Sequence, residues 1–129
     1  FNEIRDASLL GDKIKVNRLL GEIQFQADDF MFYLNNIANR VTKLLEIQNI
    51  SKETKDHEIA LDALKTKVFW KDKPIYLQQL NKWSEKKLEN ALNKIGKVEV
   101  LMKRNSQIRN DILIKALLIN VCNQASNLA

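Results

Sequence analysis

The side chains best suited to catalysis are few and scattered along this sequence. It holds one histidine, His57, and one cysteine, Cys122, which lie far apart in the chain. A cysteine nucleophile needs a neighbouring base, so these two side chains would have to meet in the fold by chance. His57 has no cysteine, histidine or clustered carboxylate at metal-ligand spacing, and no glycine-rich phosphate loop occurs. We therefore expect no catalytic, cofactor-binding or metal site.

Each of these residues also has a structural interpretation, which we favour. His57 stands in a polar stretch and is expected to be a solvated surface residue. Cys122 stands in the most apolar stretch, where a thiol is usually buried and inert. Asp28 and Asp29 resemble a pair of acid–base carboxylates, but we interpret them as stabilising a helix N-terminus through its dipole.

Glu99 and Lys103 are the most informative charged pair. Helical spacing places both of them in an apolar stripe that contains Leu92, Ile95 and Met102. An isolated charge would be costly to bury there, but two opposite charges four residues apart can bond to each other. Two interpretations stay open, namely an ion pair within one helix at the edge of the core, or a pair that bonds across a subunit interface.

Aromatic residues supply the other candidates for an interface. Phe32 falls on the side of its helix away from Leu34, so it is either covered by a neighbouring segment or offered to a partner. Trp70 and Trp83 flank a helix that begins near Pro74, and we expect both to pack as core or interface anchors. Because lysines lie close to these aromatic residues, stacking on nucleic acid is an alternative.

Apolar residues recur at helical spacing almost throughout, and 3 glycines and 1 proline leave few positions that break a helix. We predict an all-α fold, a single bundle of about six helices over residues 1–129. The first expected helix ends at about residue 10, the second runs from 12 to about 21, and the third runs from about 28 to 47. A loop at 48–56 leads into a short helix. Of the last three helices, one begins at about 74, one runs from 84 to about 104, and one runs from about 108 to 124. Their expected caps are Gly11, Asp12, Ser51 or Asp56, and Ser84.

The net charge of +5 is unevenly spread. Residues 1–64 carry 8 Lys/Arg and 11 Asp/Glu, or −3, whereas residues 65–129 carry 13 and 5, or +8. The basic half is interpreted as solvated helix faces, or as a surface that attracts phosphate or an acidic protein. No apolar run reaches the roughly 20 residues that span a bilayer. A single cysteine allows no internal disulfide, so we expect a cytoplasmic protein. Because no apolar run is long enough, we expect no membrane contact.

Several features recur in a fixed order along the chain: Gly11-Asp12, Leu19-Leu20, the stripe over 30–45, Trp70, Lys73, Tyr76, Ser84, Leu88, Glu99 with Lys103, and the apolar run over 112–122. Their order and spacing resemble the C-terminal collar domain of the delta subunit of bacterial DNA polymerase III clamp loaders. Glu99 stands where that family has an aspartate, and Arg104 and Asn105 follow where it often has a glycine.

The resemblance implies a role in DNA replication as a subunit-assembly module. Collar domains of this family join the clamp-loader subunits, while the N-terminal ATPase-like domains of delta open the sliding clamp. We expect this chain, which begins at Phe1, to be a fragment that lacks those domains, and so to contact other clamp-loader subunits directly, the clamp only through the missing part, and DNA weakly or indirectly. It would be a non-catalytic part of the holoenzyme. The candidate interface residues are Glu99, Lys103, Phe32, Trp70 and Tyr76.

Two other functions compete with this one. A basic helical nucleic-acid-binding module would use the positively charged second half of the chain. A small helical enzyme is disfavoured, because the sequence lacks a metal, nucleophile or phosphate-binding constellation.

Overall fold

The computed structural model describes residues 1–26, 29–104 and 107–127, and within these ranges it is an all-α bundle without strands. The predicted fold class is confirmed. The elements in chain order are α1 (Asn2–Leu10), α2 (Lys13–Glu22), α3 (Phe30–Thr54), α4 (His57–Asp62), the 3₁₀ turn η1 (Trp70–Asp72), α5 (Lys73–Leu80), α6 (Glu85–Lys103) and α7 (Asn110–Ser126).

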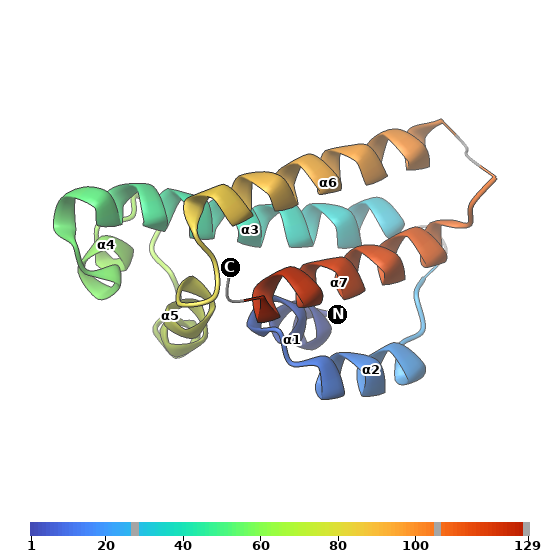
Figure 1. The fold of residues 1–129 in the computed structure, drawn as a ribbon, viewed down its shortest axis with the longest axis horizontal. Helices are drawn as coiled ribbons and strands as arrows, with labels where there is room; N and C mark the ends of the chain where they lie inside the picture. Colours follow the sequence, from blue (N-terminus) through green and yellow to red (C-terminus); the bar gives the residue numbers. More distant parts are fainter. Residues whose placement is uncertain (27–28, 105–106, 128–129) are drawn as a thin grey trace.

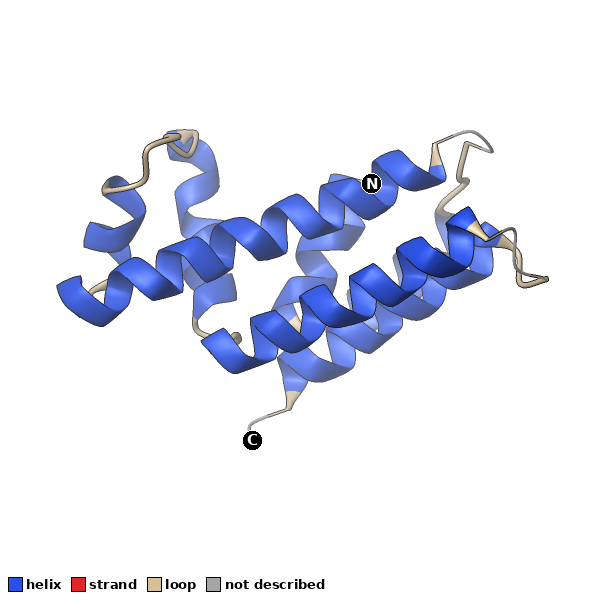
Figure 2. Cartoon of the chain, turned by 90° about the horizontal axis from the view of Figure 1, so that it is seen from above, coloured by secondary structure: helices blue, strands red, loops and turns tan. Residues whose placement is uncertain are grey.

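Three long helices set the long axis of the molecule (Figure 1). α3 and α6 run antiparallel and pack along their length, and α7 runs antiparallel to α6 beside them (Figure 2). α1 packs against α7 and α5, and α2 packs against α1 and α7. α4 folds back onto the C-terminal half of α3, which closes one end of the bundle.

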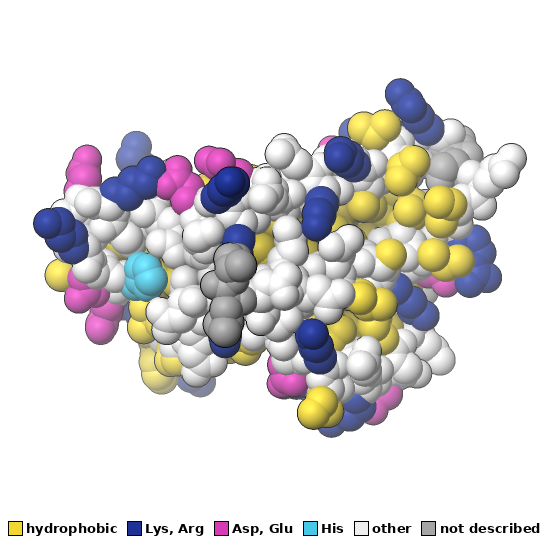
Figure 3. Space-filling view, viewed as in Figure 1, with side chains coloured by type: hydrophobic (Ala, Val, Ile, Leu, Met, Phe, Trp, Pro, Cys, Tyr) yellow, Lys and Arg dark blue, Asp and Glu magenta, His cyan; other side chains and the backbone are white. Residues whose placement is uncertain are grey.

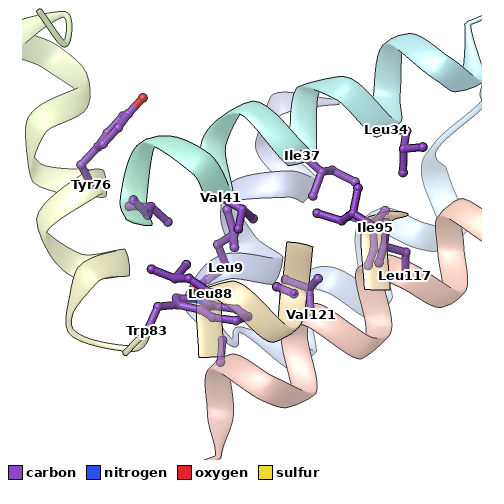
Figure 4. Packing of buried hydrophobic residues seen from close by; sticks show 14 of the residues in the cluster. Leu9, Leu34, Ile37, Val41, Tyr76, Trp83, Leu88, Ile95, Leu117 and Val121 are labelled. Atoms are coloured by element: carbon purple, nitrogen blue, oxygen red, sulfur yellow. Dashed lines mark hydrogen bonds between the residues drawn. The ribbon is translucent and has the colours of Figure 1, made fainter. Parts of the chain in front are cut away.

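One apolar core holds these helices together (Figure 4). Each long helix contributes side chains three and four positions apart, which is the spacing that forms one face of a helix. Burying a Leu, Ile or Val side chain fully stabilises a fold by about 1.5–3 kcal/mol. Residues that meet in this core are Leu34, Ile37 and Val41 from α3, Leu88 and Ile95 from α6, and Leu117 and Val121 from α7.

Side-chain caps begin three of the helices as the sequence predicted. Asp12 accepts from the Lys15 amide at 3.1 Å to begin α2, and Ser84 accepts from the Lys87 amide at 3.2 Å to begin α6. Asp56 accepts from the Glu58 amide at 2.8 Å to begin α4. These bonds satisfy amides that have no partner inside their helix, so each cap sets a helix start.

The predicted loop at residues 48–56 is wrong for its first seven positions, because α3 continues to Thr54. Tertiary contacts override the polar sequence there. Gln48 donates from Nε2 to the carbonyls of Leu80 at 3.1 Å and Trp83 at 2.7 Å, and the preceding Ile47 is fully buried. Ser51, the alternative cap, instead donates its hydroxyl to the Ile47 carbonyl within α3.

The other helix ends differ from prediction by a few residues. α3 begins at Phe30 after Asp29, which makes no side-chain cap, and Asp28 lies outside the described residues. α7 begins and ends two positions later than expected. His57 is the first residue of α4 rather than part of a loop, which corrects its predicted setting.

Gly11 ends α1 in the left-handed conformation, with φ +73°. A Cβ at this position would lie 2.9 Å from the Ser126 backbone nitrogen of α7. Both the positive φ and the close approach of α7 therefore require glycine. The predicted cap is confirmed, and it brings the ends of α1 and α7 together.

Of the helices that the structure describes, none combines the length and apolar character needed to cross a membrane.

Candidate functional site

Glu99 and Lys103 form an ion pair within α6, with Lys103 Nζ 3.1 Å from Glu99 Oε1. Their side chains are 40% and 67% exposed, whereas Ile95 and Met102 of the same helix are buried. The pair thus lies beside the core rather than in it, on the solvent side of α6. Exposed ion pairs of this kind contribute about 0–1 kcal/mol to stability. Because both side chains are exposed, both charges remain accessible to a partner.

α7 is apolar on its exposed side as well as on its buried side. Leu113, Leu117 and Val121 are buried, but Ile112 and Ile119 remain 46% and 43% exposed. Aliphatic residues of α6 lie on the same side of the molecule, where hydrophobic side chains gather over the C-terminal half of α6 and the N-terminal half of α7 (Figure 3). We call this surface the α6–α7 face; on α6 it comprises Gly96, Val100 and Leu101, which line one hollow, and on α7 it comprises the exposed side chains of Ile112, Ala116 and Ile119, of which Ile119 also lines a second hollow against α2.

An open hollow of about 520 Å³ marks the α6 part of this face. Its lining is almost entirely apolar and includes Val100, Leu101 and the bare backbone of Gly96, with Asn93 and Lys97 at the edge. Lys94 donates from Nζ to Asn120 Oδ1 at 3.0 Å, which ties α6 to α7 beside the hollow. A partner side chain placed in the hollow would therefore meet mostly carbon atoms, with the Lys97 side chain among the lining residues.

The two tryptophans occupy opposite environments. Trp83 is 1% exposed, and its Nε1 donates to the Leu9 carbonyl at 2.7 Å, so its core placement is confirmed. Trp70 is 67% exposed in η1, next to Phe69 at 58%, so the expectation of a core position for Trp70 is wrong. η1 packs against α5, and Trp70 lines an open hollow with Leu61 of α4, so the indole remains exposed. Lys71 Nζ lies 5.4 Å from the centroid of the Trp70 ring.

Phe32 is 63% exposed on α3, as its position opposite Leu34 suggested. Its ring meets the edge of Tyr33 at a centroid distance of 6.0 Å. Tyr33 in turn contacts Phe1, Phe25 and Phe30, so Phe32 is the exposed member of an aromatic group at the N-terminal end of α3. Its proposed contact with a partner stays a prediction.

Tyr76 lies in the core at 9% exposure, with the Arg40 guanidinium 4.1 Å from its ring centroid. In this structure the ring is covered by α3 rather than offered to solvent. Arg40 also donates from Nη1 to Asp6 Oδ1 at 2.8 Å and to Gln79 Oε1 at 3.0 Å. Tyr76 is thus one member of a polar junction between α1, α3 and α5, and its interface role stays a prediction.

The polar junction contains two arginines and one carboxylate. Arg5 donates from Nε to Asp6 Oδ1 at 3.0 Å and from Nη1 to Asn36 Oδ1 at 2.7 Å. Burial, followed by the nearby Arg5 charge, lowers the pKa of Arg40 from its ordinary value. Both arginines remain hydrogen-bonded, so the junction resembles a structural network, and its carboxylate Asp6 also lines a hollow of about 370 Å³.

Sequence reasoning missed this junction, although one signal was present. Arg40 stands seven, three, four and seven residues from Tyr33, Ile37, Leu44 and Ile47, all of which are buried. Helical spacing therefore placed a cation in the centre of the buried face of α3. A cation at such a position requires partners from other helices, and they are Asp6 from α1 and Gln79 from α5.

The residues with catalytic potential remain apart. Cys122 is buried against Ala7 and Val16, and this burial raises the pKa of its thiol. His57 is half-buried at the start of α4, at the other end of the bundle. Among the described residues, no group of three His, Cys, Asp or Glu side chains could hold a metal ion.

In comparisons with known proteins, no family model, curated protein or solved structure matches this chain.

Proposed function

We propose that this chain is a subunit-assembly module, the collar-type helical domain of a clamp-loader delta subunit that acts in DNA replication. The observation that carries the proposal is the second apolar side of α7, where Ile112 and Ile119 remain exposed although the opposite side fills the core. The resemblance of the sequence to delta collar domains supplies the choice among assemblies.

The spacing on α7 supports a docking role. Ile112, Ala116 and Ile119 are four and three residues apart, so they form a single stripe on one side of the helix. Exposed aliphatic residues occur singly on most proteins, whereas a contiguous set marks an interaction site. If a helix of a neighbouring subunit packed on this stripe, each Å² of apolar surface removed from water would contribute about 25 cal/mol of favourable transfer free energy.

The charged residues of α6 fit the same role. Glu99 and Lys103 lie within reach of solvent next to the α6–α7 face, where they can exchange their mutual ion pair for contacts with a neighbouring subunit. Such charges select a partner and set its register more than they add affinity. In this proposal ATP hydrolysis and clamp opening belong to other parts of the clamp loader.

Size-exclusion chromatography of the chain mixed with the other clamp-loader subunits tests the proposal. We expect a complex with the unaltered chain, and its loss when Ile112→Ser and Ile119→Ser are combined. Ile59→Ser is the matched control, because Ile59 is 56% exposed on α4, away from the α6–α7 face. Absence of a complex with the unaltered chain, or equal loss with the control, would refute the proposal.

A second function is favoured by the exposed aromatic pair of η1 and the loop before it. Phe69 and Trp70 are both more than half exposed, and Lys71 lies over the indole. Lys65 and Lys67 are exposed in the same connection. Aromatic faces flanked by lysines can stack on the bases of single-stranded nucleic acid while the charges contact phosphates.

Titration of a fluorescently labelled single-stranded oligonucleotide distinguishes this second function. It predicts binding that weakens steeply with added salt and is lost with Trp70→Ala. Phe32→Ala is the control, since Phe32 is about as exposed as Trp70 but lies in the aromatic group at the N-terminal end of α3, away from η1. Binding that ignores salt, or that Phe32→Ala weakens as much, excludes η1 as a nucleic-acid site.

A further inference from the structure

We propose that the hollow beside Gly96 receives an acidic amphipathic helix from a partner protein. This inference rests on the proposed assembly function and adds the chemistry of the partner to it. It depends on the shape of α6 at Gly96 and on the charge around the α6–α7 face.

The shape comes from a glycine in the middle of a long helix. A Cβ built at Gly96 meets nothing within 4 Å, so the missing side chain leaves open space rather than making room for a neighbour in this chain. Glycine destabilises a helix interior by about 0.5–1 kcal/mol relative to alanine, and here no close internal packing offsets that cost. Val100 and Leu101, one turn further along, form the apolar wall of the hollow.

The segment that carries the face has a positive net charge. Residues 93–119 contain six Lys/Arg and two Asp/Glu, a difference of +4. Both acids are already paired locally, Glu99 with Lys103 at 3.1 Å and Asp111 with Arg109 at 3.3 Å. Lys97 stands exposed at the rim of the hollow. A partner with carboxylates beside its apolar stripe complements this surface, whereas a basic partner is repelled.

The lining favours a protein helix over a nucleic acid. Its apolar side chains, Val100 and Leu101, are aliphatic, and the neighbouring α7 adds the exposed aliphatic residues Ile112 and Ile119. Bases stack on aromatic rings, and the exposed rings of Trp70 in η1 and of Phe69 just before it lie near the N-terminal end of α6, away from the hollow. Aliphatic stripes on neighbouring helices form the groove that an amphipathic helix fills with residues one turn apart.

The probe for this site is an idealised amphipathic peptide of about 18 residues, with leucines on one face and glutamates on the other. Fluorescence anisotropy of the labelled peptide against the whole 129-residue chain measures its binding. We expect the glutamate peptide to bind and its affinity to fall with added salt. A peptide with lysine in place of every glutamate is the matched control and should bind at least roughly tenfold more weakly.

Filling the hollow should block the peptide without harming the fold. Gly96→Leu places a side chain in the open space, and we expect it to weaken binding roughly tenfold or more. Gly21→Leu is the matched control, since a Cβ at Gly21 on α2 also meets nothing within 4 Å. Circular dichroism establishes that both variants remain helical, and both should gain helix propensity.

A charge reversal tests the rim separately. Lys97→Glu should weaken the glutamate peptide and strengthen the lysine peptide, whereas Lys65→Glu, an exposed lysine far along the chain, should do neither. The inference is overturned if the glutamate peptide does not bind, if both peptides bind alike, or if Gly96→Leu and Lys97→Glu leave binding unchanged. Displacement of the peptide by a single-stranded oligonucleotide would also overturn it.

This inference and the assembly proposal fail in different ways. If the chain joins the clamp-loader subunits while Gly96→Leu and Lys97→Glu have no effect on that complex, the assembly function stands and the acidic helix is wrong. If no complex forms with those subunits, the assembly function falls, whatever the peptide does.

Discussion

Two regions of this molecule reverse the usual distribution of side chains. The polar junction of α1, α3 and α5 buries arginines, and the α6–α7 face exposes aliphatic residues. In the junction, Arg40 finds Asp6 and Gln79 within 3.0 Å, so the buried polar atoms satisfy one another. On the face, Ile112 and Ile119 are only half covered by this chain. The buried polar atoms are satisfied within this chain, whereas the exposed aliphatic residues are the ones for which we propose a partner protein.

The largest expected effect comes from breaking the junction. Arg40→Ala leaves Gln79 Oε1 without its donor, removes one of the donors to Asp6 Oδ1 and uncovers Tyr76, so we expect a loss of about 2–4 kcal/mol in the free energy of unfolding. Urea denaturation followed by circular dichroism measures it. Arg18→Ala is the matched control, because the Arg18 side chain is 59% exposed and its ion pair with Glu3 is long, with 4.0 Å between Arg18 Nη2 and Glu3 Oε1. Equal effects of the two substitutions would mean that the junction contributes no more than the surface.

The two tryptophans provide a smaller and sharper comparison. Trp83→Phe removes the hydrogen bond to the Leu9 carbonyl and some core volume, so we expect a loss of about 1–3 kcal/mol. Trp70→Phe changes an exposed ring and should remain within about 0.5 kcal/mol of the unaltered chain. Thermal unfolding of both variants measures the difference. A Trp70→Phe variant as unstable as Trp83→Phe would contradict the exposed placement of η1.

The smallest expected effect is a pH dependence from Cys122. Burial raises the pKa of its thiol above the ordinary value of 9.0, so the unfolded chain loses this proton at lower pH than the folded chain. The folded state then binds more protons, and stability falls as pH rises through 9.0. Cys122→Ala should remove this decline in urea titrations at successive pH values. An unchanged decline in that variant would assign it to another group.

The sequence predicted helix ends correctly where a capping residue acts on its neighbours in the chain. Asp12, Ser84 and Gly11 act through their own neighbours along the chain, so spacing and residue type were sufficient to find them. The extension of α3 to Thr54 was not predictable this way, because the bonds from Gln48 reach residues 80 and 83. The core alternative for Trp70 was wrong for the same reason, since only the path of the connection decides whether η1 is covered. Its alternative role as an interface anchor stays a prediction.

In the candidate site, too, some features follow from neighbouring residues in the sequence and others from contacts between distant residues. The sequence by itself determined an all-α chain with an ion pair at Glu99 and Lys103 and an unusually apolar last helix, because helical periodicity reports which residues share a face. Only the tertiary structure decided which apolar faces meet and which stay exposed, that Arg40 joins three helices, and that Gly96 opens onto solvent. Those outcomes depend on contacts between residues distant in the chain, which periodicity within one helix does not encode.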